Sequence, residues 1–130
     1  MIVVDASAIL EVLLASPHAT RIGNVLFARG QTLHAPHLID LEVAQVLRRF
    51  VLSGELAADR GEEALEDMLD LPLTRYPHAE FLTRIWELRR NLTAYDAAYL
   101  ALAEALDASL VTRDARLGSA PGHSARVDVV

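Results

Sequence analysis

Four acidic residues lie among apolar neighbours, each at a point where a strand should end or a helix should begin. They are Asp5, Glu42, Asp96 and Asp114. A carboxylate in such surroundings is costly to bury unless it is paired, hydrogen-bonded or bound to a cation. The chain has no Lys, and Arg113 and Arg116 lie near only one of the four acids. Mg²⁺ or Mn²⁺, which prefer oxygen ligands, are therefore the predicted counter-ions.

Each acid taken alone has a simpler interpretation. The three Asp residues stand where a carboxylate often caps a helix or interacts with its dipole, and Glu42 could be an ordinary surface charge. Together they favour a common site, because like charges gathered at one edge of a sheet repel one another. Ser7 and Thr112 are expected either to hydrogen-bond the carboxylates or substrate, or to cap the local backbone. The residues themselves leave both roles open.

The elements expected to position these acids alternate between strand and helix. Short apolar runs predict strands at Ile2–Asp5, Thr32–Ala35, Leu73–Tyr76, Ser109–Thr112 and Ala125–Val130. Helical spacing and end signals predict helices at Ala6–Leu14, Ala19–Arg29 with Gly30 at its end, His37–Ser53, Ala57–Leu71, Ala79–Arg90 and Asp96–Leu106, with Thr93 or Tyr95 at its start, then a turn or short helix at Asp114–Leu117 and a loop at Gly118–Gly122.

This alternation predicts one α/β domain, residues 1–130, with a parallel sheet of about five strands and helices on both faces. In such sheets, ligands bind beyond the carboxyl ends of the strands. All four acids are expected at that edge. The chain is long enough, and at 52% apolar residues hydrophobic enough, to bury one core.

Composition excludes several classes of protein. The absence of Cys excludes disulfides, thiolate catalysis and Cys-based zinc sites, and the absence of Lys excludes P-loop and Schiff-base enzymes. No apolar run is long enough for a membrane span, and nothing resembles a signal peptide, so we expect a cytoplasmic protein. The net charge of −6 lacks the basic footprint of a groove-binding protein. It is compatible with a nuclease that holds phosphate through cations, and it favours a basic protein partner.

Four segments carry a family resemblance. They are Val3–Ala8, Pro36–Val43, Leu92–Ala103 and Leu110–Asp114. The first resembles the opening motif of PIN domains, and the others resemble the second, third and fourth motifs of VapC-type toxins from type II toxin–antitoxin systems. Their order and spacing match over nearly the whole chain, so the four together are far more specific than any one.

The resemblance implies a PIN-like fold and a Mg²⁺- or Mn²⁺-dependent endoribonuclease. Its motif acids correspond to Asp5, Asp96 and Asp114, which would hold the principal metal, and to Glu42, which would complete a second position or orient the attacking water. A metal at this site would lower the pKa of that water and stabilise charge on the phosphate. Some relatives carry a further acid or amide just beyond the fourth motif, where this chain has Arg116.

The resemblance also implies partners: an RNA substrate, a cognate VapB-like antitoxin with a basic tail, and a second copy of the chain. The apolar faces of the helices after Pro36 and Pro77 are candidates for the homodimer interface. The only Trp, Trp86, is expected in the core or an interface. Asp40 lies two residues from Glu42, on a different helix face, and the five His residues show no metal-ligand spacing.

Other functions stay open. The chain could be a PIN-fold RNA-processing nuclease outside toxin–antitoxin systems, or a catalytically silent PIN-fold binding module. A haloacid-dehalogenase-type phosphatase needs a second Asp two residues after its nucleophile, where this chain has Ser7. A phospho-receiver domain needs a Lys, which the chain lacks.

Overall fold

A parallel sheet is the frame of the molecule. The computed structural model describes residues 1–130. The five strands are β1 (Ile2–Val4), β2 (Leu33–Pro36), β3 (Leu73–Tyr76), β4 (Ser109–Thr112) and β5 (Val127–Val129). They are parallel throughout, in the order β3-β2-β1-β4-β5. The predicted strands and the α/β class are confirmed.

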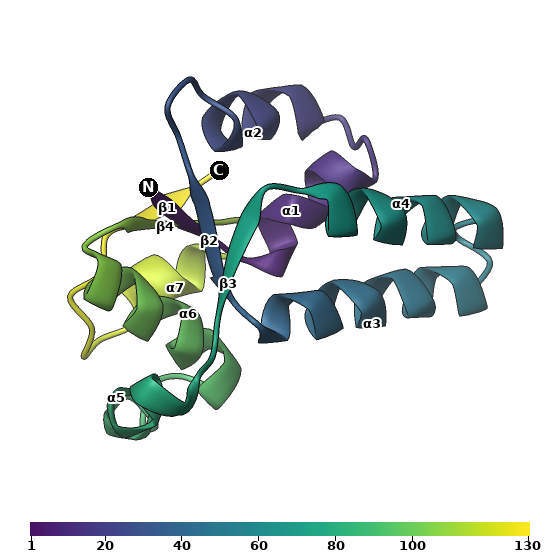
Figure 1. Cartoon of the computed structure of the whole chain (residues 1–130). Helices are drawn as coiled ribbons and strands as arrows, with labels where there is room; N and C mark the ends of the chain where they lie inside the picture. The colour runs from purple at the N-terminus through teal and green to yellow at the C-terminus, as the bar shows by residue number, and fades with distance from the viewer.

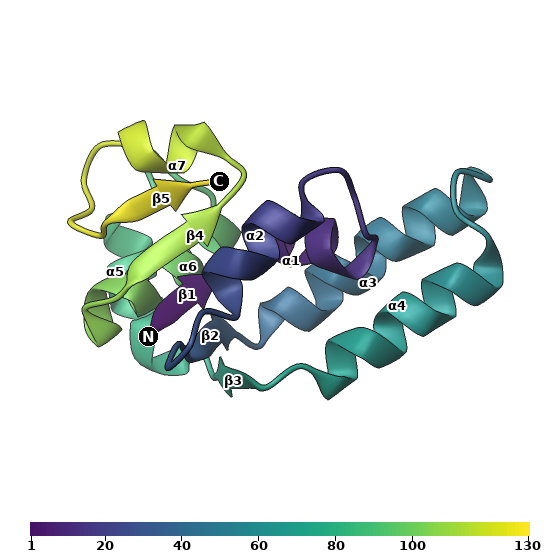
Figure 2. The ribbon, with the colours of Figure 1, turned by 90° about the horizontal axis from the view of Figure 1, so that it is seen from above.

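Helices cover both faces of this sheet, as predicted. They are α1 (Ala6–Leu13), α2 (Ala19–Leu26), α3 (Leu38–Leu52), α4 (Ala58–Asp70), α5 (Leu82–Glu87), α6 (Ala94–Leu106) and α7 (Ala115–Ser119), with a 3₁₀ turn at Ala79–Phe81. In Figure 1, α3 and α4 form an antiparallel pair that extends away from the sheet. Figure 2 shows α1 and α2 on one side of the strands and α5, α6 and α7 on the other. Right-handed connections between parallel strands produce this division.

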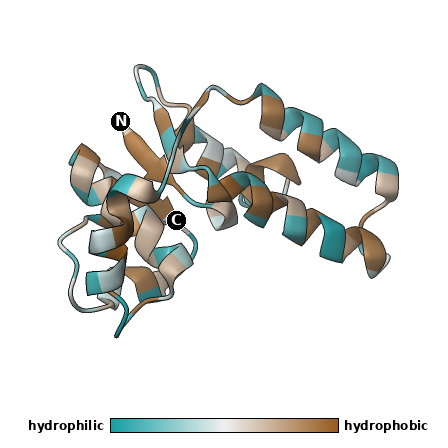
Figure 3. Ribbon diagram, turned by 60° about the horizontal axis from the view of Figure 1, so that its bottom comes forward, coloured by the Kyte–Doolittle hydropathy of each residue, from teal (hydrophilic) through white to brown (hydrophobic).

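The core lies between the sheet and its covering helices. β1 is buried along its whole length, and α6 is buried from Ala97 to Ala103, so both are almost entirely apolar. In Figure 3 the strand at the N-terminus is hydrophobic throughout, whereas α3 and α4 alternate between hydrophobic and hydrophilic residues. No helix is both long enough and apolar enough to span a bilayer. The burial of α6 is relevant to function because this helix carries one of the four acids.

Several predicted boundaries were wrong. The helix predicted at Ala19–Arg29 ends at Leu26, and Gly30, with a φ of 81°, lies in the following turn instead of capping the helix. The helix predicted at Ala79–Arg90 is divided into the 3₁₀ turn and α5. The last turn of α5 is tighter than an α-helical turn, because the N–H of Leu88 donates to the carbonyl oxygens of both Arg84 and Ile85. The predicted loop at Gly118–Gly122 begins inside α7. Local propensity does not detect such shifts, because packing against neighbouring elements sets them.

Close packing of α4 on α3 makes Gly61 sensitive to substitution. A Cβ at this position would lie 2.8 Å from Cγ2 of Val51. We expect Gly61→Ala to lower the free energy of unfolding by about 1 kcal/mol, because overpacking of about 1–3 kcal/mol exceeds the gain in helix propensity. Gly23→Ala is the matched control, since its nearest neighbour, Phe27, is 3.9 Å away. Urea denaturation should show it to be as stable as the parent or up to about 1 kcal/mol more so; equal destabilisation of both would contradict this account.

Candidate active site at the carboxyl edge of the sheet

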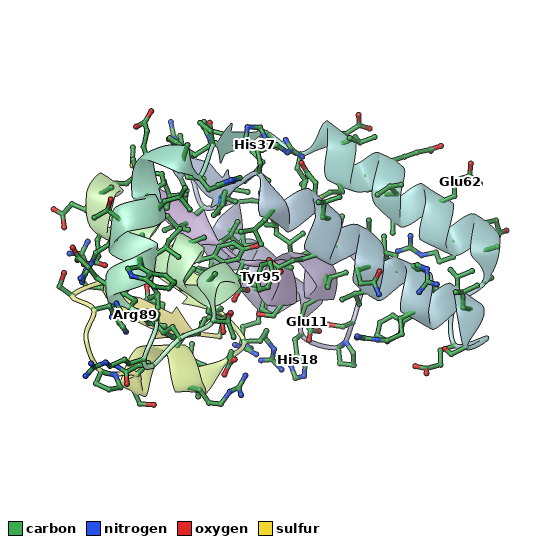
Figure 4. The ribbon with its side chains drawn as sticks, turned by 90° about the horizontal axis from the view of Figure 1, so that it is seen from below. Glu11, His18, His37, Glu62, Arg89 and Tyr95 are labelled. Carbon is green, nitrogen blue, oxygen red and sulfur yellow. The ribbon has the colours of Figure 1, made fainter.

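Four elements bring the four predicted acids to one edge of the sheet. Asp5 directly follows β1, and Asp114 lies two residues after β4. Glu42 is in the second turn of α3, which follows β2, and Asp96 is in the first turn of α6. Figure 4 views the molecule from this edge, with Tyr95, the neighbour of Asp96, near the middle. The structure therefore places the four acids at the carboxyl edge of the sheet, as predicted.

Asp5 is the most firmly held of the four carboxylates. It is only 8% exposed, and as N-cap of α1 it accepts a hydrogen bond from the backbone N–H of Ala8 at 3.2 Å. Ser7 Oγ donates to one carboxylate oxygen at 2.6 Å, and Thr112 Oγ1 donates to the other. Burial raises the pKa of Asp5, and these hydrogen bonds oppose the rise.

The hydroxyls of Ser7 and Thr112 also connect the adjacent strands β1 and β4 beyond their carboxyl ends. Ser7 Oγ accepts from the backbone N–H of Arg113 at 2.9 Å, while Thr112 Oγ1 accepts from that of Asp114 at 3.0 Å. The sequence left two roles open for these residues, and each residue has both: it hydrogen-bonds a carboxylate and also a backbone N–H group. As a result, the positions of Asp5 and Asp114 are coupled.

Glu42 reaches the site from α3 and is held by a residue that sequence reasoning missed. Tyr99, buried on α6, donates its hydroxyl to Glu42 Oε1 at 2.6 Å. The pKa of Glu42 is raised, first by burial and further by the charges of Asp5 and Asp96. The sequence could have indicated Tyr99 through its spacing, because it is three residues after Asp96 and so lies on the same face of α6.

Asp96 and Asp114 form the outer part of the site. Burial raises the pKa of Asp96, and the charge of Asp114 raises it further. Asp114 caps α7 through the N–H of Arg116, and its two oxygens also accept from the guanidinium of Arg116. This contact lowers the pKa of Asp114. Asp114 is therefore the one acid of the four with a cationic partner.

The donor set has the chemistry of a site for a hard cation. Three half-buried or buried carboxyls have raised pKa values, caused mainly by burial and, at Glu42 and Asp96, by neighbouring acids. A bound divalent cation would offset both effects. The side chains as placed do not converge, however: no three His, Asp or Glu residues are arranged to hold one metal ion. Metal binding at this edge stays a prediction that rests on the type and closeness of these groups.

Two cavities lie on either side of the acids. A cleft of about 850 Å³ between α1 and α3 is lined mainly by apolar side chains, including Leu10, Leu38 and Phe50, and reaches Ser7 and Glu42. A smaller cavity of about 250 Å³ is bordered by Asn91, Thr93, Asp96, Asp114 and Arg116. The acidic edge is thus open to solvent between an apolar cleft and a polar pocket.

Other residues singled out in the sequence have structural partners. Asp40 pairs with Arg75 through two contacts of 2.7 and 2.9 Å, so it does not join the site, as its helix face suggested. His34 is buried and bonded to Thr32 and Tyr76. Of the two places expected for Trp86, the core or an interface, the structure excludes the core. Trp86 is 67% exposed and stacks against Arg89, which leaves an interface as the remaining interpretation.

Comparison with known proteins identifies close sequence relatives. The PIN domain family model matches residues 2–122. VapC ribonuclease Mb0985 of Mycobacterium bovis is 49% identical over 117 residues, covering 90% of this chain and 88% of the relative. The match includes nearly the full length of both proteins.

Solved structures share the fold. PAE2754 from Pyrobaculum aerophilum has a TM-score of 0.71 at 26% identity, covering 98% of this chain and 82% of that one. VapBC2 from Rickettsia felis, whose structure was solved bound to a DNA fragment from its promoter, has a TM-score of 0.73 at 17% identity, covering 99% and 98%. At 17% identity, the likeness to VapBC2 concerns the fold alone.

Because the pKa of Asp96 is raised, removing this carboxylate should stabilise the folded protein, by an amount that depends on pH. Above its folded-state pKa the ionised form is disfavoured in the folded protein; the penalty disappears as pH falls toward the ordinary value of 3.8. We therefore expect Asp96→Asn, in EDTA, to melt at a higher temperature than the parent at neutral pH and at nearly the same temperature near pH 4.

Asp70→Asn, on the exposed surface of α4, is the control and should melt like the parent at every pH. A loss of stability in Asp96→Asn at neutral pH would show that the carboxylate is not under electrostatic strain.

Proposed function

The chain belongs to the PIN-domain family and, within it, to the VapC group, and we propose that it is an endoribonuclease toxin of a type II toxin–antitoxin pair. The observation that supports this most is the gathering of Asp5, Glu42, Asp96 and Asp114 at one open edge of the sheet. The relatives named as VapC ribonucleases support RNA as the substrate. We place its action in the cytoplasm, with the RNA.

Asp5, Asp96 and Asp114 would hold the principal cation, Mg²⁺ or Mn²⁺, and Glu42 would lie beside it. When bound, the cation supplies Lewis-acid stabilisation of the phosphate oxygens and lowers the pKa of a water molecule. Asp5 presents its carboxylate in a fixed orientation, because two hydroxyls and a backbone N–H hold it. Such preorganisation lowers the rearrangement needed during the reaction.

Glu42 is suited to orient the attacking water and accept its proton. Tyr99 engages Oε1, so Oε2 is the atom left to accept the proton. Tyr99 thereby acts as a positioning residue: its hydroxyl fixes the rotamer of Glu42 without contact with substrate.

Cleavage of RNA tests the proposal directly. Purified protein with Mn²⁺ or Mg²⁺ should cut total RNA into discrete fragments, and EDTA should stop the reaction. Asp5→Asn should lower the rate by more than about 100-fold, because the central carboxylate of the site is lost. Asp70→Asn, a remote carboxylate on α4, should retain the parent rate. Cleavage that survives EDTA, or an Asp5→Asn variant as active as the control, would overturn the proposed mechanism.

We also propose an antitoxin whose basic tail lies in the cleft between α1 and α3. The apolar walls of this cleft suit aliphatic and aromatic side chains, and its inner end reaches Glu42. A guanidinium there would pair with the acids through charge-assisted hydrogen bonds and stand in the place of the cation. The net charge of −6 favours such a partner, and a toxin–antitoxin complex from Klebsiella pneumoniae, which shares the fold, is a precedent for such an assembly.

A homodimer is the remaining part of the proposal. Leu82 and Trp86, one turn apart on α5, are both exposed. Exposed apolar side chains of this size are typical of an interface. Trp86→Glu should therefore convert a dimer to a monomer in sedimentation velocity, because a buried interface disfavours an unpaired charge. Leu69→Glu on α4 is the control; a monomeric parent, or a Trp86→Glu variant that stays dimeric, would contradict this assignment.

A further inference from the structure

Arg116 occupies both oxygens of one of the four acids. Its Nε donates to Asp114 Oδ1 at 3.0 Å and its Nη2 donates to Oδ2 at 2.7 Å. This two-point geometry is the strongest that a guanidinium makes with a carboxylate. Since a cation at Asp114 would need the same oxygens, Arg116 and the cation compete for them.

The Arg116 side chain can nevertheless separate from Asp114, because little else holds it. It is 87% exposed, and Asp114 is its only side-chain partner. By contrast, Arg84 contacts Glu87, Glu104 and the carbonyl of Gly122, and Arg113 contacts Glu11 and the carbonyl of Val130. An exposed ion pair adds little to the stability of the fold, so breaking it carries only a small penalty. The cap of α7 would survive the change, because the backbone N–H of Arg116 bonds Asp114 independently of the guanidinium.

The surroundings favour replacement by a more highly charged ion. The charge of Asp114 acts on Asp96, and the charge of Asp96 acts on Glu42, so the pair lies within a group of acids. One guanidinium neutralises one of these charges, whereas a divalent cation neutralises two and can bind oxygens from several residues.

We propose that Arg116 is a displaceable counter-ion of the acidic site: its guanidinium holds Asp114 and releases that carboxylate when a divalent cation binds. The inference rests on the proposed function, because it concerns the same cation site. Competition by Arg116 lowers the affinity of the site for the cation and sets the concentration at which it fills. Arg116 also borders the smaller cavity, together with Asp96 and Asp114.

Calorimetric titration with Mn²⁺ measures the competition. Arg116→Ala should bind Mn²⁺ about three- to tenfold more tightly than the parent, because the group that competes for Asp114 and its positive charge are both removed. Arg116→Lys, which keeps the charge but loses the two-point contact, should fall between them. Arg126→Ala is the matched control, since Arg126 is exposed and pairs with Asp107 at the opposite end of β4. It should bind Mn²⁺ like the parent.

Displacement itself is visible by NMR. The Nε–Hε signal of Arg116, assigned by its absence in Arg116→Ala, should shift and lose protection from exchange as Mg²⁺ is added. It should follow the same binding curve as the backbone amide of Asp114. Thermal melts of each variant in EDTA confirm that it is folded.

The possible outcomes distinguish a failure of this inference from a failure of the proposed function. If parent and Arg116→Ala bind Mn²⁺ equally well, or if the Arg116 signal is unchanged at saturating Mg²⁺, the exchange is overturned while the cation site stands. If Arg116→Lys binds Mn²⁺ as weakly as the parent, charge alone acts and the occupancy of Asp114 is not the cause. If no variant binds Mn²⁺ or Mg²⁺, both the exchange and the metal-dependent function are overturned.

Discussion

The mutual repulsion of four carboxylates at one sheet edge is the constraint on which the rest of the site depends. The parallel topology places Asp5 and Asp114 beyond adjacent strands, and α3 and α6 bring Glu42 and Asp96 beside them. Such a cluster does not stabilise the fold: burial raises the pKa of Asp5, Glu42 and Asp96, and like charges add to the rise at Glu42 and Asp96. Its presence makes sense if a cation belongs there, because the same features that disfavour the free carboxylates favour a divalent ion.

The protein holds these acids mainly with neutral donors. Ser7, Thr112 and Tyr99 orient Asp5 and Glu42 through hydroxyl groups, which leave the negative charge uncompensated. Arg116 is the exception, and it is exposed and attached at one place only. The inner part of the site is therefore held by hydrogen bonds without a positive partner, while its outer rim carries one exposed guanidinium.

Much of this arrangement could be predicted from the sequence, because it follows from local signals. Apolar β-branched runs such as Ile2–Val4 identify buried strands, and their alternation with helices implies a parallel sheet whose carboxyl edge collects Asp5 and Asp114. The hydroxyl of Tyr99 was missed because a Tyr in an apolar helix has the pattern of a core residue. The pairing of Arg116 with Asp114, and the early end of α2 at Leu26, depend on side-chain and packing geometry that spacing does not encode.

The measurement that tests the central claim most directly is anomalous diffraction from crystals soaked in Mn²⁺. The account predicts a Mn²⁺ peak at the carboxyl edge of the sheet, with oxygen atoms of Asp5, Asp96 and Asp114 bound to it directly or through water. A saturating soak that shows no peak at this edge would contradict it. So would one that places Mn²⁺ only on exposed acids of α4 such as Glu62, Glu63, Glu66, Asp67 and Asp70.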